Sequence, residues 1–220
     1  MRDIRSIKAA VFDLDGTLFD STAAWEGLGE RYLLSRGIAP MPGLDEKLRC
    51  MTLPDGSAYL KSAYSLPEAP EQIQRDILRG IEEFYLHECP LKPGARELLE
   101  LFSQRGIGLA IATAGDERLA RAALQRLGVS DLFSAVLTCE NFGGKDKPDI
   151  FISAAAAAGG IPENTAVFED SLHALLTAKQ AGFITAAVYD PGEPQKARLR
   201  ASADCYFESL SDCAALFSQL

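Results

Sequence analysis

Past residue 106, the chain alternates short apolar runs with segments in which apolar positions recur every three or four residues. The apolar runs predict strands and the periodic segments predict helices. Strands are expected at 107–113, 135–139, 165–169 and 184–188, and helices at 116–127, 148–158 and 171–181. Strands that alternate with helices are typical of a parallel sheet covered by helices. We therefore expect an α/β fold, whose sheet also takes in the N-terminal apolar run 9–12.

Between residues 21 and 89 the pattern changes to helices alone, most clearly at 22–36 and 70–87. The second segment predicts one apolar face, because large residues recur at every fourth position with two more beside them. These residues are Ile73, Ile77, Ile81 and Tyr85, with Leu78 and Phe84. We expect this region to be a helical domain inserted between residues 1–20 and 90–220, with hinges at 20–21 and 89–93.

The composition is that of a globular protein with an acidic surface. Of the 220 residues, 47% are hydrophobic, and the formal net charge is −9 with a pI near 4.8. A nucleic-acid partner is not expected, because binding to a polyanion needs a basic surface. The apolar run after residue 8 is too short for a secretory signal or a membrane span, so we expect a cytoplasmic protein without a membrane partner.

The cysteines do not suggest a stabilising framework. Five of them are dispersed along the chain without a Cys-x-x-Cys pair, which indicates neither a set of disulfides nor a zinc site. A cleft covered by inserted helices needs no partner chain to complete it. We therefore expect a monomer or a weak homo-oligomer.

Two carboxylates follow the first predicted strand directly, Asp13 and Asp15. Side chains alternate between the two faces of an extended backbone, so both should leave the strand end on the same side, with Leu14 facing away. Two carboxylates held so close repel one another unless a divalent cation lies between them or one keeps its proton. Both arrangements serve phosphoryl transfer. The alternative is a strand that ends in an ordinary Asp-Gly turn.

Two other strand ends also carry polar groups, and ligands of open α/β sheets gather at the carboxyl ends of the strands. The strand at 107–113 ends in Thr113-Ala114-Gly115, where a hydroxyl and backbone N–H groups precede a helix and could bind an anion. The strand at 165–169 ends in Glu169-Asp170, followed by Ser171 as a helix N-cap. Together with the first two acids, Glu169 and Asp170 would form an oxygen-rich cluster of the kind that Mg²⁺ prefers.

A glycine-rich loop before the helix at 148–158 presents Lys145 and Lys147. A lysine at this place could neutralise the oxygens of a phosphate group. Either lysine could equally be a solvated surface residue, which is the usual position of lysine.

In this order, the four segments resemble the motifs of the haloacid dehalogenase-like (HAD) phosphohydrolases, in the helical-cap branch that includes β-phosphoglucomutase and phosphoglycolate phosphatase. The resemblance extends from residue 9 to residue 189. It implies a Rossmann-like core made of residues 1–20 and 90–220, a helical cap domain at 21–89, and a small phosphorylated metabolite as the substrate.

The resemblance also implies a role for each site residue. Asp13 would be the nucleophile that forms an aspartyl-phosphate, and Asp15 the general acid and base. Lys145 takes the place of the motif lysine, because Pro148 aligns with a proline of the pattern and Lys147 then falls in a variable position. Lys145 and the segment Thr113-Ala114-Gly115 would bind the phosphate. Mg²⁺ would be held by Asp13, the Asp15 carbonyl, Glu169 and Asp170.

Two alternatives differ from a phosphatase. In the sugar-phosphate mutases of this family a histidine follows the second Asp by ten residues, and here that position is Trp25. An indole cannot exchange a proton as histidine does, so hydrolysis is favoured over a β-phosphoglucomutase-like transfer. Trp25 would line the substrate pocket or belong to the core of the helical bundle. The second alternative, a non-catalytic phosphate-binding module, is disfavoured because Asp13, Asp15, Lys145 and Asp170 are all present.

Overall fold

The computed structural model describes residues 4–48 and 51–219. It forms two compact units, Met1–Thr22 with Cys89–Leu220 and, separately, Ala23–Glu88. We call the first the core unit and the second the helical unit. Among the described residues, no helix has both the length and the apolar character needed to cross a membrane.

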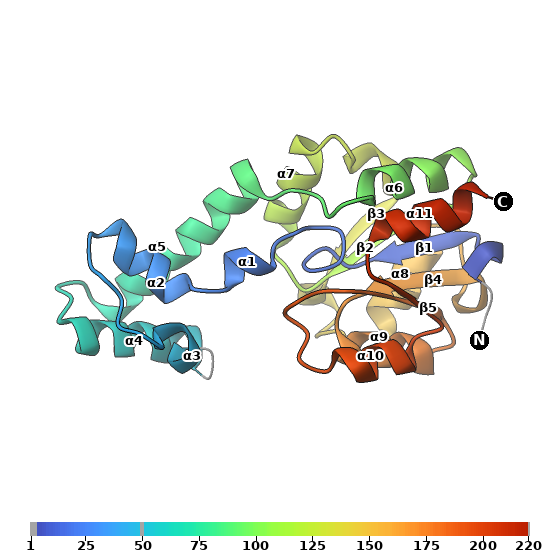
Figure 1. Cartoon of the computed structure of the whole chain (residues 1–220). Helices are drawn as coiled ribbons and strands as arrows, with labels where there is room; N and C mark the ends of the chain where they lie inside the picture. The colour runs from blue at the N-terminus through green and yellow to red at the C-terminus, as the bar shows by residue number, and fades with distance from the viewer. Residues whose placement is uncertain (1–3, 49–50, 220) are drawn as a thin grey trace. The chain divides into compact units, whose positions relative to one another are not determined.

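The core unit is built on a six-stranded parallel sheet in the order β3-β2-β1-β4-β5-β6. The strands are β1 (Ala9–Phe12), β2 (Gly108–Thr113), β3 (Ala135–Thr138), β4 (Thr165–Glu169), β5 (Ile184–Val188) and β6 (Cys205–Phe207). This confirms the predicted α/β fold with a Rossmann-like parallel sheet, and the N-terminal strand lies in its middle (Figure 1). The pattern did not predict β6, which has only three residues.

Both faces of the sheet are packed, which is why its central strands are continuous apolar runs. Every residue of β1, β4 and β5 is buried. On one face the Phe12 and Phe168 rings stack 4.4 Å apart, with Phe102 beside them. On the other face Val11 and Val167 belong to a cluster formed with α8 (Asp149–Ala157). Because β1 and β4 are packed on both faces, the residues that follow them are held at the same edge of the sheet.

The remaining helices of the core unit are α6 (Ala95–Gln104), α7 (Glu117–Arg126), α9 (Leu172–Gln180), α10 (Lys196–Ser202) and α11 (Leu210–Ser218). Figure 1 shows α6 and α11 side by side. The predicted helices at 116–127, 148–158 and 171–181 correspond to α7, α8 and α9. Asp116 caps α7 by accepting a hydrogen bond from the Leu119 N–H, 2.9 Å away. Ser171 precedes α9, but its side chain makes no capping bond, contrary to the prediction.

The helical unit contains α1 (Thr22–Trp25), which starts at the last core residue, α2 (Leu28–Ser35), α3 (Leu44–Leu48), α4 (Leu53–Tyr64) and α5 (Pro70–Glu83). The expected single helix at 22–36 is wrong, because Gly27 takes a left-handed φ of 63° and separates α1 from α2. Helix α5 continues into a π turn at Phe84–Glu88. Its four-residue spacing does bury Ile73, Ile77 and Ile81, but Leu78 is 44% exposed and lies off this face.

Candidate active site

Three carboxylates meet where β1 and β4 end. The two strands are parallel neighbours, with Phe12 opposite Phe168, so the residues that follow emerge at the same edge of the sheet. The Asp13 N–H donates to the Phe168 carbonyl, 3.0 Å away. One carboxylate oxygen each of Asp13, Glu169 and Asp170 lies within 4.8 Å of the others. Asp13 and Glu169 are buried, with exposed fractions of 8% and 1%, so this cluster differs from a solvated acidic surface.

Lys145 reaches this cluster from the glycine-rich loop. Its Nζ lies 2.5 Å from Asp13 Oδ1 and 2.6 Å from Glu169 Oε1. The side chain is only 11% exposed, whereas Lys147 is exposed to solvent. Burial would lower the pKa of Lys145, but the two carboxylates outweigh that effect and raise it above its usual value. Lys145 is therefore a fixed positive charge at the site.

Asp170 is held by the turn after β1. Thr17 is fully buried and its Oγ1 donates to Asp170 Oδ1 over 2.7 Å. Gly16, with φ of 78°, lies so close that a Cβ at this position would be 2.5 Å from Asp170 Oδ2. Thr17 was not among the site residues predicted from the sequence. Its position directly after Gly16 could have indicated this role. The positive φ of Gly16 allows the chain to turn there, and the turn places the Thr17 hydroxyl beside Asp170.

Asp15 takes a different position from Asp13. Its Oδ1 accepts a 2.7 Å hydrogen bond from the Ser21 hydroxyl, and Asp15 is not one of the three clustered acids. A Cβ built on Gly115 would lie 3.4 Å from both Asp15 Oδ2 and Thr113 Oγ1. Asp15 therefore faces the end of β2 rather than the end of β4. The turn between Asp13 and Phe19, in which three N–H groups donate to the Leu14 carbonyl, separates the two carboxylates that the extended-strand argument kept together.

The strand end at Thr113-Ala114-Gly115 is partly used by its own hydrogen bonds. The Gly115 N–H donates to Thr113 Oγ1 at 3.1 Å, so it is not free in the way that the sequence suggested. Thr113 is buried, Ala114 is exposed, and the Thr113 hydroxyl keeps its own proton for another acceptor. The structure thus brings Thr113 and Gly115 beside Asp15.

Burial and mutual repulsion raise the pKa values of two carboxyl groups in the acidic cluster. Burial, followed by the charges of Glu169 and Asp13, raises the pKa of Asp170 well above its usual range. Burial also raises the pKa of Glu169 to about 7, although Lys145 opposes the shift. One lysine does not balance three clustered carboxylates. Hard oxygen ligands gathered in this way suit a divalent metal ion, which would relieve their repulsion.

Gly16→Ala tests whether the turn after β1 positions Asp170. The added methyl group would displace the Asp170 carboxylate, so we expect at least a tenfold loss of divalent-cation affinity, measured by calorimetric titration. The matched control is Gly143→Ala, because Gly143 also has a positive φ of 73° but no atom within 4 Å of the added Cβ. Equal affinity losses in both variants would mean that backbone strain, not the contact with Asp170, is responsible.

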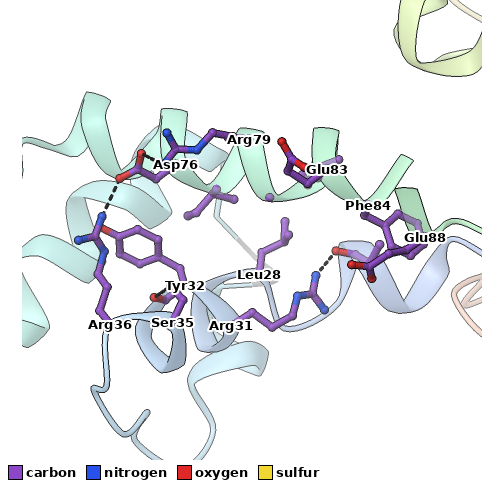
Figure 2. Close-up of a pocket in the computed structure, with 14 residues that line it drawn as sticks. Leu28, Arg31, Tyr32, Ser35, Arg36, Asp76, Arg79, Glu83, Phe84 and Glu88 are labelled. Atoms are coloured by element: carbon purple, nitrogen blue, oxygen red, sulfur yellow. Dashed lines mark hydrogen bonds and ion pairs between the residues drawn. The ribbon is translucent and has the colours of Figure 1, made fainter. Parts of the chain in front are cut away.

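The helical unit holds a separate cavity of about 520 Å³, shown in Figure 2. Its walls come from α1, α2, α5 and the π turn, and arginines and acids line it together. Arg36 pairs with Asp76 at 2.6 Å and also with Glu68, so it ties α2 to α5. Among the described residues, this cavity contains no cluster of acids comparable with that of the core unit.

Trp25 does not belong to the bundle core. Its indole is 48% exposed, and Nε1 donates to the Tyr85 hydroxyl at 3.0 Å. The interpretation of Trp25 as a core residue is therefore wrong, and its predicted contact with substrate stays a prediction.

The family model for haloacid dehalogenase-like hydrolases matches residues 7–182, which include all four acidic, basic and hydroxyl-bearing strand ends. The chain belongs to this family. The prediction made from its motifs is thereby confirmed, and with it the class of hydrolases. Together with the buried acidic cluster, membership of the family indicates a divalent metal ion.

Named relatives are consistent with the assignment. Hexitol phosphatase B of Escherichia coli (strain K12) is 27% identical over 96% of both chains. The β-phosphoglucomutase of Mycobacterium bovis is also 27% identical, over 80% of this chain and 79% of its own. A HAD family hydrolase of Deinococcus radiodurans R1, solved with bound phosphate and sodium, superposes with a TM-score of 0.75 at 21% identity, over 98% of this chain and 96% of its own. This last match supports the fold alone.

Proposed function

We propose that the protein is a Mg²⁺-dependent phosphatase that hydrolyses small phosphomonoesters, such as sugar phosphates, through an aspartyl-phosphate intermediate. The observation that carries this proposal is the buried contact of Lys145 with Asp13 and Glu169, beside Asp170, at the ends of β1 and β4. The core unit would act as the phosphohydrolase core and the helical unit as the cap domain. We place the reaction in the cytoplasm.

Asp13 would attack the phosphorus atom. Its Oδ1 is held by Lys145, and its backbone by the Phe168 carbonyl, so the carboxylate is oriented before substrate arrives. Attack forms a bond between the carboxylate oxygen and phosphorus and breaks the ester bond to the substrate oxygen. Lys145 keeps its proton because of the carboxylates around it, and would bind the phosphate oxygens together with Thr113 and the Ala114 N–H. The Gly115 N–H would join them only by exchanging its present bond to Thr113 Oγ1 for one to the substrate.

Asp15 would supply the proton that the departing alkoxide needs and later accept one from the attacking water. Its position beside Thr113 and Gly115, away from the three clustered acids, suits that role, because a group that moves protons must not be tied up as a carboxylate ligand. When bound, Mg²⁺ would reduce the repulsion between a phosphate dianion and the Asp13 carboxylate. Asp13, Asp170 and the Asp15 carbonyl would hold it, with Glu169 as a further ligand or partner.

Removal of the cation and substitution of one of its proposed ligands test this assignment. At a Mg²⁺ concentration of 100 Kd, binding stabilises the fold by about 2.7 kcal/mol, which raises the unfolding temperature of a chain of this size by roughly 5–11 °C. Calorimetry should detect this shift in the natural protein and in Asp131→Asn, an exposed control, but not in Asp170→Asn. A chelator should also abolish phosphate release. Full stabilisation of Asp170→Asn by Mg²⁺ would contradict the assigned site.

A sugar-phosphate mutase is the second candidate, because the β-phosphoglucomutase of Mycobacterium bovis matches this chain as closely in identity as the hexitol phosphatase does. The two reactions share the aspartyl-phosphate step and differ in the acceptor of the phosphoryl group, water or a sugar. Trp25 favours hydrolysis, since its indole offers no group that exchanges protons. Its exposed face is proposed to contact the substrate.

A further inference from the structure

A second buried polar cluster lies at the end of β5, and, besides burial, the charge of its Asp190 contributes to the raised pKa of Asp170. Asp190 is 2% exposed and accepts hydrogen bonds from three donors. They are Thr22 Oγ1 at 2.8 Å, Lys92 Nζ at 2.7 Å and the Gly192 N–H at 2.8 Å. Lys92 Nζ also donates to the Tyr189 carbonyl at 2.8 Å. We call Asp190, Thr22 and Lys92 the linker clamp.

The clamp joins the two chain segments between which the helical unit is inserted. Thr22 is the last residue of the first segment, and Lys92 lies near the start of the second. The segments also bond to each other directly, because the Asp20 N–H donates to the Pro90 carbonyl and the Lys92 N–H donates to the Leu18 carbonyl, at 3.0 and 2.8 Å. The positions 20–21 and 89–93, which the sequence suggested as hinges, are thus bonded within the core unit.

Stability alone does not account for this cluster. The side chains of Lys92 and Asp190 are 11% and 2% exposed, and a buried ion pair of this kind usually recovers little more than the cost of desolvating it. The cluster instead fixes the position of Thr22. Lys92 and the Gly192 N–H hold the Asp190 carboxylate in place, and that carboxylate accepts the Thr22 hydroxyl. The clamp therefore fixes the geometry of the segment that ends at Thr22.

That segment also holds Asp15. Ser21, the neighbour of Thr22, is fully buried and donates its hydroxyl proton to Asp15 Oδ1 at 2.7 Å. A displacement of Thr22 moves the Ser21 backbone and lengthens this bond. The path from Asp190 to Asp15 consists of two hydrogen bonds and one peptide link, all within the core unit.

We propose that Asp190 and Lys92 are positioning residues, which act through Thr22 and Ser21 to orient the Asp15 carboxylate for proton transfer to the leaving group. This inference rests on the proposed function of Asp15. None of the clamp residues belongs to the acidic cluster, and an uncharged replacement of Thr22 breaks the clamp while the charge of Asp190 near Asp170 stays in place. Loss of the clamp should therefore slow the reaction only where the leaving group needs a proton.

The test compares two substrates in single-turnover experiments with Mg²⁺ present. Glucitol 6-phosphate has an alkoxide leaving group that must be protonated, whereas the phenolate of p-nitrophenyl phosphate leaves without a proton. For Thr22→Val, which removes the hydroxyl donor, we expect first-turnover alcohol release from glucitol 6-phosphate to fall about tenfold and phenol release to change less than twofold. Thr22→Ser, which keeps the hydroxyl, should restore the natural rates. Asp190→Asn should change the ratio of the two rates in the same direction, in addition to a change common to both substrates that follows from the loss of its charge near Asp170.

The chain offers a matched control on the same strand. Thr185 Oγ1 donates to Asp204 Oδ2 at 2.9 Å, and Lys179 pairs with the other oxygen of that carboxylate. Thr185 lies near the start of β5, whereas Asp190 follows the end of this strand. Thr185→Val should leave the ratio of the two rates unchanged. The same change of ratio in Thr185→Val, or none in Thr22→Val, overturns the inference.

Asp15→Asn separates this failure from failure of the proposed function. If, in the first turnover, Asp15→Asn slows alcohol release from glucitol 6-phosphate but not phenol release while Thr22→Val does not, the acid role of Asp15 holds and only the clamp inference is overturned. If Asp15→Asn slows first-turnover alcohol and phenol release equally, the acid role of Asp15 and the inference that rests on it are both overturned.

Discussion

Asp13→Asn should abolish phosphate release, with a fall in turnover of roughly a thousandfold or more, as for the loss of other enzymatic nucleophiles. An amide of the same size cannot form the acyl-phosphate bond, while the surrounding packing is kept. Initial rates of inorganic phosphate release at saturating Mg²⁺ and substrate measure the effect. The loss should lie in the rate of the chemical step and not in the affinity for substrate.

The control for this change is Asp131→Asn, because Asp131 is exposed whereas Asp13 is buried. It removes the same charge from the core unit and should leave turnover within twofold. A further check uses acid quenching during turnover, which should trap a phosphorylated chain in the natural protein and none in Asp13→Asn. Retention of full phosphatase activity by Asp13→Asn would refute the nucleophile assignment.

Lys145→Met should lower the free energy of unfolding by about 3 kcal/mol, the scale on which removal of one partner from a buried ion pair destabilises proteins. Two buried carboxylates, Asp13 and Glu169, would then face each other without the amine that now contacts both. The unfolding temperature in the absence of divalent cations should fall by roughly 6–12 °C. Differential scanning calorimetry measures the change, and phosphate release should also be lost.

Lys147→Met provides the comparison, because Lys147 lies two positions further along the same loop and is exposed. It should change the unfolding temperature by less than about 2 °C and retain turnover, since exposed charges contribute little to stability. If the two variants behaved alike, the contacts of Lys145 with the acidic cluster would not have the importance assigned to them.

The parts of the site that the sequence predicted well depend on sheet geometry. Asp13, Glu169 and Asp170 converge because parallel strands end at one edge, a rule that needs only the strand positions. Lys145 could be preferred over Lys147 only through its place in a motif, since both precede the same helix with the same charge. The contacts of Lys145 with Asp13 and Glu169 now give a physical reason for that preference.

Other features depend on turns and long-range contacts that periodicity does not describe. The turn after β1 sends Asp15 toward Thr113 and places Thr17 on Asp170, although strand alternation predicted a common direction for the two acids. Asp190 contacts residues 98 and 168 positions away, so no local pattern could reveal it. The break at Gly27 was hidden because its flanking residues keep helical spacing.

We propose that this site transfers phosphoryl groups from small esters to water. The most direct measurement of this transfer is phosphate release from a panel of phosphomonoesters that includes β-glucose 1-phosphate, with Mg²⁺ or with chelator, and with identification of the organic product. We expect Mg²⁺-dependent release of inorganic phosphate that is absent from Asp13→Asn. Formation of glucose 6-phosphate without phosphate release, or release that persists in chelator, would contradict the proposal.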